Sequence, residues 1–154
     1  MNSLVADLAA IPYDTLAAEI QRRVETLSAV DPLDNPARAA AMFSDIARKR
    51  KEHFVAVYVD AQYRPIHREV VSIGTLTASL VHPREVFAPA IVHGAAALIV
   101  AHNHPSGDPT PSREDRETTR RLADAGRILD IPILDHVIVA KSGHYSFKEH
   151  GRID

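Results

Sequence analysis

The sequence contains no cysteine among its 154 residues. This absence excludes disulfide bonds, thiol nucleophiles, iron–sulfur clusters and the cysteine-rich sites that hold structural zinc. Any metal site in this chain must therefore be built from histidine, aspartate and glutamate side chains and water. Nine histidines are available for such a site.

Long apolar runs are also missing. The longest purely apolar stretch, Ala95–Ala101, is far too short to cross a bilayer, and no basic segment precedes the apolar N-terminal residues as in a signal peptide. Lys and Arg number 18 against 20 Asp and Glu, so the chain lacks an overall basic charge for binding nucleic acid but has room for a local patch. We expect a cytoplasmic protein that does not bind membranes.

Glycine is absent from the first fifty residues, and their pattern predicts helices. Four apolar residues recur there at helical spacing: Leu16, Ile20, Val24 and Leu27. We therefore expect a helical extension over residues 1–33, followed by one main domain at residues 34–154. The periodicity fits packing of this stripe on its own domain and equally on a second copy, which would make a homo-oligomer.

A second helix is predicted to start where Asn35 precedes Pro36, since a capping side chain before proline favours the first helical turn. Its apolar side would carry Met42, Phe43 and Ile46. We expect it to end in the basic run Arg48–Lys51, which suits the negative end of the helix dipole. This interpretation makes the run a solvated helix end rather than a nucleic-acid patch.

The remaining residues alternate between strand and helix patterns. Strands are predicted at residues 54–59, 66–73, 95–101, 131–139 and 144–147, and helices at residues 84–93 and 113–129. The inward face of the second of these helices would carry Leu122, Ala125, Ile128 and Leu129. The alternation predicts an α/β fold with a mixed central sheet and helices packed on it.

The segment from His102 to Asp115, HNHPSGDPTPSRED, carries the candidate chemistry. His102 and His104 are two residues apart at the end of a buried strand, so both point to one face of the sheet. Asp115, in the first turn of the following helix, could supply a third ligand. Three protein ligands with an open fourth position are typical of catalytic zinc rather than structural zinc.

These residues also carry a family resemblance. The pattern H-x-H-x7-S-x2-D, formed by His102, His104, Ser112 and Asp115, resembles the signature of the JAMM (MPN+) metalloprotease family. Further segments resemble its bacterial RadC-like branch: EHF at residues 52–54, GTL at 74–76, VHPREVF at 81–87 and LDH at 134–136. The resemblance covers roughly residues 34–151 and implies the MPN architecture, which is cytidine-deaminase-like.

The resemblance implies a role for each matching residue. His102, His104 and Asp115 would bind one zinc ion per chain, and Ser112 would assist the oxyanion. Glu52, directly before the first strand, would act as the general base. The implied activity is that of a zinc-dependent peptidase or isopeptidase, a hydrolase whose peptide or protein substrate is unknown.

Two of these roles have alternatives. Ser112 and Asp115 also form a helix capping box, which requires no metal, and the capping and ligand roles are compatible. Glu69 on a strand and Glu85 in the first turn of a helix compete with Glu52 as the general base. The helix dipole alone explains an acid at Glu85.

Other residues near the motif have supporting roles in the prediction. Asp135 and His136 form a pair that could orient a ligand imidazole from outside the metal site. Asn103 and Ser106, together with the prolines at residues 109 and 111, are expected to shape a rigid loop.

The sequence leaves other functions open. Full-length RadC proteins carry an N-terminal helix-hairpin-helix region that depends on glycine, and the first fifty residues here have none. The chain thus resembles the short RadC-like proteins of prophages and plasmids, and the family label of DNA repair carries little weight. The alternatives are a non-catalytic binding or regulatory module of DNA metabolism and a metal-dependent nuclease.

Overall fold

A computed structural model of the chain describes residues 32–33, 35–74 and 81–153, and in addition residues 12, 14–15 and 17–19. The chain divides into two units, Met1–Asp31 and Pro32–Asp154. In the first unit, residues 14–15 and 17–19 are helical. The four apolar residues of the predicted N-terminal stripe lie outside the described residues, so the helical extension stays a prediction.

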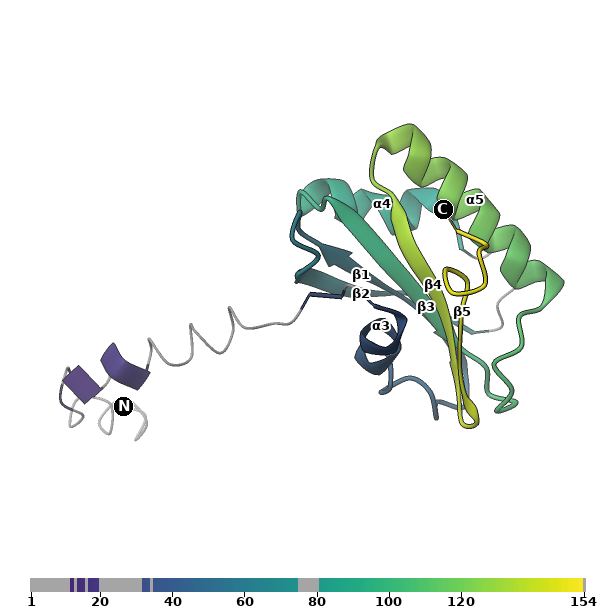
Figure 1. Cartoon of the computed structure of the whole chain (residues 1–154), viewed down its shortest axis with the longest axis horizontal. Coiled ribbons are helices and arrows are strands. Elements are labelled where there is room, and N and C mark those ends of the chain that lie inside the picture. The colour runs from purple at the N-terminus through teal and green to yellow at the C-terminus, as the bar shows by residue number, and fades with distance from the viewer. Residues whose placement is uncertain are drawn as a thin grey trace. The chain divides into compact units, whose positions relative to one another are not determined.

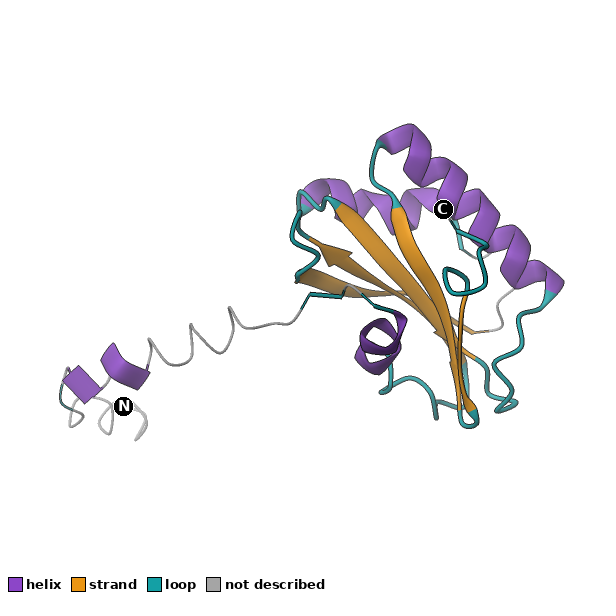
Figure 2. Ribbon diagram, viewed as in Figure 1, coloured by secondary structure: helices purple, strands orange, loops and turns teal. Residues whose placement is uncertain are grey.

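The second unit is built on a five-stranded sheet with the order β2-β1-β3-β4-β5. Figure 2 draws its strands in orange. Its strands are β1 Glu52–Val59, β2 Pro65–Gly74, β3 Ala97–Asn103, β4 Ile133–Ala140 and β5 Gly143–Ser146. β3 and β4 run parallel, whereas the other neighbouring strands are antiparallel. The predicted mixed sheet is therefore confirmed.

Helices cover both faces of this sheet (Figure 1). α3 (Pro36–Met42) packs on one face, and α4 (Pro83–Val92) and α5 (Arg113–Leu129) pack on the other. Because side chains alternate along a strand, the buried central strands contribute residues to two separate hydrophobic cores, one on each face of the sheet. The buried histidines of β3 and β4 lie on the face toward α5. The α/β fold class is confirmed. Among the helices in the described ranges, none has the length and apolar character needed to cross a membrane.

The structure corrects the end of the helix that starts at Asn35. α3 ends at Met42, so the basic run Arg48–Lys51 does not terminate a helix. A series of tight turns follows, in which the Ile46 N–H donates to the Phe43 carbonyl at 3.1 Å. Three-residue turns place side chains i and i+3 on the same side, and this brings both Phe43 and Ile46 into the core.

The inward face of α5 also differs from the prediction. Leu122 is buried, but Ile128 is 84% exposed and Leu129 is 43% exposed. Ile128 lies six residues beyond Leu122, which is one full turn plus about 240° around the helix axis. Its side chain therefore points away from the face that carries Leu122. Gly126 takes the inward position instead, because a Cβ there would lie 2.7 Å from the Ile131 carbonyl oxygen. The helix thus approaches the following segment closely through glycine.

Candidate metal centre

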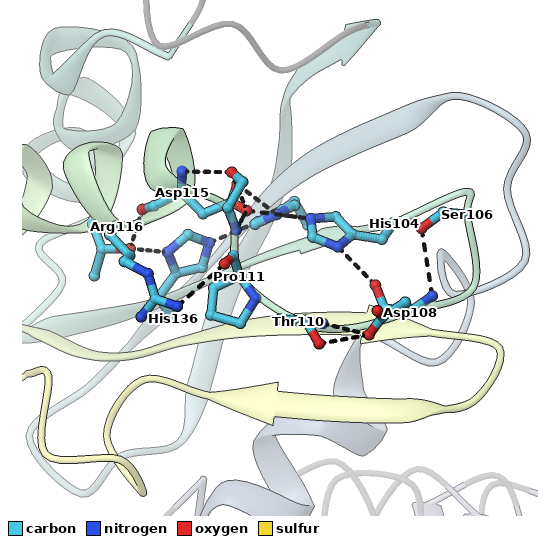
Figure 3. A network of polar contacts seen from close by, with 11 residues as sticks. His104, Ser106, Asp108, Thr110, Pro111, Asp115, Arg116 and His136 are labelled. Atoms are coloured by element: carbon cyan, nitrogen blue, oxygen red, sulfur yellow. Dashed lines mark hydrogen bonds and ion pairs between the residues drawn. The ribbon is translucent and has the colours of Figure 1, made fainter.

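The three predicted metal ligands come together at one end of the sheet, and Figure 3 shows two of them, His104 and Asp115. His102 is the penultimate residue of β3, His104 directly follows the strand, and Asp115 lies in the first turn of α5. His102 and Asp115 are buried, and His104 is half-buried. The start of α5 over the end of β3 therefore places a carboxylate against two imidazoles.

The spacing of the donor atoms fits a zinc ion. The two Nε2 atoms of His102 and His104 are 3.1 Å apart. Asp115 lies 3.1 Å from His102 Nε2 through Oδ1 and 3.4 Å from His104 Nε2 through Oδ2. Zinc bonds of about 2.0–2.1 Å at tetrahedral angles separate neighbouring donor atoms by about 3.3 Å. The three residues could therefore hold a metal ion.

A buried hydrogen-bond chain fixes which nitrogen of His102 faces this site. The Thr119 hydroxyl donates to the Asp115 carbonyl oxygen at 2.6 Å, so Thr119 Oγ1 accepts from His136 Nδ1, also at 2.6 Å. Burial lowers the pKa of His136 well below its usual range, so the ring is neutral and its Nε2 accepts. His102 Nδ1 therefore donates to His136 Nε2 at 2.8 Å, which leaves the other ring nitrogen, Nε2, to face the candidate metal site.

His104 is oriented by a backbone carbonyl rather than by a side chain. Its Nδ1 donates to the Asp108 carbonyl oxygen at 2.8 Å (Figure 3), and this turns Nε2 toward His102 and Asp115. The hydrogen bond to Asp115 raises the pKa of His104, although burial opposes the charge. A proton therefore competes with a metal ion for the Nε2 atom of His104.

Asp115 serves as ligand candidate and helix cap at once. Burial opposes its ionisation, but its close contacts with the imidazoles of His102 and His104 hold its pKa well below the usual range. Its Oδ2 also accepts the Ser112 N–H at 2.7 Å and the Ser112 hydroxyl at 2.6 Å. The predicted capping box is therefore present. In this arrangement the Ser112 hydroxyl hydrogen points to Asp115.

Glu52 lies on the same face of the sheet as the two candidate-ligand imidazoles. Phe54 pairs with His102 in the antiparallel β1–β3 register, so Glu52, two residues earlier, lies level with His104. The Phe54 ring stacks on His102, with centroids 6.1 Å apart. The pKa of His104 is raised chiefly by its hydrogen bond to Asp115, and the negative charge of Glu52 makes a smaller contribution in the same direction.

The two competing glutamates lie elsewhere. Glu69 is on β2, which β1 separates from β3, and it pairs with Ala56 rather than with the start of β1. Its carboxylate lies 3.6 Å from His67 Nε2. Glu85 occupies the first turn of α4. The register therefore favours Glu52 as the acid beside the candidate metal ligands.

Asn103 has a role that the sequence did not reveal. This buried side chain accepts the His53 N–H at 2.7 Å and donates to the carbonyl oxygens of Lys49 at 3.1 Å and Lys51 at 3.2 Å. It therefore holds the segment that carries Glu52, rather than the following loop that we predicted it to shape. Its position between the two histidines was the only signal in the sequence.

The predicted Asp135–His136 pair divides between the two faces of the sheet. His136 contacts His102, as described above, whereas Asp135 accepts the Ser146 hydroxyl at 2.6 Å and the Lys148 N–H at 3.0 Å. Burial raises the pKa of Asp135. Only the imidazole of the pair touches a candidate ligand.

Thr119→Val is expected to lower zinc affinity about 10–100-fold, because it removes the group that sets the His136 tautomer while keeping the side-chain shape. Competitive zinc titration of the purified chain measures this change. Thr118→Val is the matched control, since its buried hydroxyl has no hydrogen-bond partner among the described residues. Equal affinities of the Thr119→Val and Thr118→Val variants would contradict the hydrogen-bond chain.

Comparison with known proteins agrees with this geometry. Residues 33–152 match the family described as the RadC-like JAB domain. The UPF0758 protein of Geobacillus sp. (strain WCH70) is 46% identical over 143 residues, which cover 89% of this chain and 62% of that protein. The UPF0758 proteins of Symbiobacterium thermophilum and Rubrobacter xylanophilus are 60% identical over 100 residues and 55% identical over 108 residues.

These two alignments cover 65% and 70% of this chain, and 43% and 47% of the relatives. The chain thus spans about half the length of these curated relatives. Their names state no activity.

Proposed function

This chain belongs to the RadC-like JAB family, and we propose that it is a metal-dependent hydrolase of amide bonds, a peptidase or isopeptidase that holds one zinc ion. One observation carries the proposal: His102 Nε2 and His104 Nε2 lie 3.1 Å apart, each within 3.1–3.4 Å of one oxygen of the Asp115 carboxylate, with Glu52 on the same face. The proposed substrate is a peptide or protein.

The donor set suits zinc, since two imidazoles and one carboxylate leave a position for a water molecule or substrate. A zinc ion there would act as a Lewis acid toward the amide carbonyl and lower the pKa of a water molecule. Glu52 would accept a proton from the water that attacks the carbonyl carbon and deliver it to the amine nitrogen as the C–N bond breaks.

Ser112 would donate a hydrogen bond to the oxygen that becomes negative during the attack. Its hydroxyl now donates to Asp115 Oδ2 at 2.6 Å, so this role requires the hydroxyl to rotate toward the substrate. The Ser112 backbone N–H, which also donates to Asp115, would keep the carboxylate in place during that rotation.

The test is an unbiased cleavage assay with the full chain. The zinc-loaded protein is incubated with a complex peptide mixture and with isopeptide-linked peptides, and mass spectrometry identifies new termini. We expect cleavage that a chelator abolishes and added zinc restores. A chain that holds one zinc ion but cleaves none of these substrates would contradict the proposal.

The same preparation also tests the alternatives from the sequence. Cleavage of single- or double-stranded oligonucleotides that requires His102 and His104 would favour a nuclease. A salt-dependent DNA complex without any cleavage would favour a binding module of DNA metabolism. A cytoplasmic location and self-association remain predictions from the sequence.

A further inference from the structure

A cavity of about 350 Å³ opens directly beside His104. Three cationic side chains line it together with that histidine: Arg48, Lys49 and Lys141. They come from two distant segments, the turns after α3 and the hairpin between β4 and β5. The fold therefore gathers positive charge next to a candidate metal ligand.

The hairpin that carries Lys141 is fastened to the loop after β3. Ser142 donates to the Gly107 carbonyl oxygen twice, from its N–H at 3.2 Å and from its hydroxyl at 2.6 Å. Lys141 packs against Gly107, where an added Cβ would lie 3.7 Å from the lysine Cβ. The His104 N–H completes the attachment by donating to the Val139 carbonyl oxygen at 3.0 Å.

The other cationic segment is fastened to β3 itself. Asn103 donates to the Lys49 carbonyl oxygen at 3.1 Å, and Ile46, two residues before Arg48, is buried. Both cationic segments are thus held by hydrogen bonds to His104 itself or to residues within three positions of it. The backbones that place these side chains are fixed, although the side chains themselves are exposed.

The acidic side chains near this cavity lie outside its lining. Among the described residues that line the cavity, none is acidic. Asp108 in the adjoining loop lines a neighbouring pocket with Lys141 and offsets part of the charge of that lysine. Its Oδ1 accepts the Thr110 N–H at 2.9 Å and the Thr110 hydroxyl at 2.7 Å (Figure 3), which holds the carboxylate toward its own loop. A ligand with its own negative charge is the natural complement of such a cavity.

We propose that this cavity is a subsite that binds a carboxylate of the substrate, so that the chain selects peptides with an acidic group next to the amide bond to be cleaved. The inference rests on the proposed amide hydrolysis, because the position of His104 relates the cavity to the reacting carbonyl. Two sources can supply the carboxylate, an acidic side chain and a free peptide C-terminus.

The test measures binding separately from hydrolysis. The metal-free, isotope-labelled full chain is titrated with a blocked tripeptide containing a central glutamate, with its glutamine counterpart, and with a neutral tripeptide bearing a free C-terminal carboxylate. The amide signals of Lys49, Gly107 and Lys141 report the binding. We expect at least one of the two carboxylate peptides to bind on the order of tenfold more tightly than the glutamine peptide.

Charge-removing variants locate the effect. Combined Arg48→Gln, Lys49→Gln and Lys141→Gln substitutions should remove the preference, whereas Arg50→Gln should keep it, because Arg50 belongs to the same basic run but does not line the cavity. Equal binding of all three peptides would overturn the proposal, and so would an equal loss in the Arg50→Gln variant.

Hydrolysis is then measured with the zinc-loaded chain and the same peptides. If acidic peptides bind preferentially but no amide bond is cleaved, the subsite stands and the proposed hydrolytic function fails. If neutral and acidic peptides are cleaved at equal rates and bind equally, the function stands and the subsite fails. A higher kcat/KM for the carboxylate peptides would support both.

Discussion

His104→Ala is expected to reduce zinc content from about one ion per chain to nearly none while the protein stays folded. Only two protein ligands would remain, so the loss of affinity should exceed the 10–100-fold typical of changes outside the ligand set. The His104 side chain is 15% exposed, against 5% for Asp115, so its removal disturbs the core least. Elemental analysis after equilibration with zinc, together with circular dichroism, measures both outcomes.

His144→Ala is the matched control, because His144 is an exposed histidine on β5. Zinc affinity should also fall on acidification. The hydrogen bond to Asp115 raises the pKa of His104, so as the pH drops through that value a proton increasingly occupies the nitrogen needed by the metal. One zinc ion retained per chain in His104→Ala would contradict the assignment of this ligand.

Glu52→Gln is expected to retain zinc but to lower the rate of amide hydrolysis about 10²–10⁴-fold. Glutamine preserves the size of the side chain but cannot accept the proton of the attacking water. The register of β1 and β3 puts this residue level with His104, and Asn103 holds the adjoining backbone. The rate is measured on peptides identified in the cleavage assay, and zinc is quantified in the same preparation.

Two matched variants test the specificity of this effect. Glu69→Gln and Glu85→Gln remove the competing carboxylates and should leave the rate unchanged, since neither residue lies beside the ligands in the sheet. Unchanged hydrolysis in Glu52→Gln would remove Glu52 from the mechanism. Loss of zinc in that variant would instead make it a metal ligand.

Sequence periodicity predicted the helices and strands whose bounds depend only on their own residues. α5 occupies the predicted residues 113–129, because a capping box at Ser112 and an amphipathic pattern are local properties. The end of α3 was not predictable in this way. Residues 43–49 tighten into turns because Phe43 and Ile46 must both reach the sheet, and that requirement exists only once the sheet is formed.

The candidate ligands were predictable for a related reason. His102 and His104 are fixed by the two-residue period of β3, and Asp115 is fixed by the first turn of α5, so only the approach of one strand end to one helix start was left to the fold. Glu52 was a weaker inference, since its relation to His104 depends on the pairing of β1 with β3. The family resemblance supplied what local pattern could not.

The sequence by itself determined the kind of chemistry: without cysteine, a metal site had to use histidine and carboxylate, and the H-x-H spacing at a strand end placed two imidazoles on one face. Only the tertiary structure decided how those groups are oriented and what surrounds them. Three features join residues that are far apart in the sequence: the hydrogen bonds that link Thr119, His136 and His102, the hydrogen bonds of Asn103 to the segment that carries Glu52, and the cationic cavity beside His104. Such contacts arise from packing and strand order, which leave no periodic signal in the sequence.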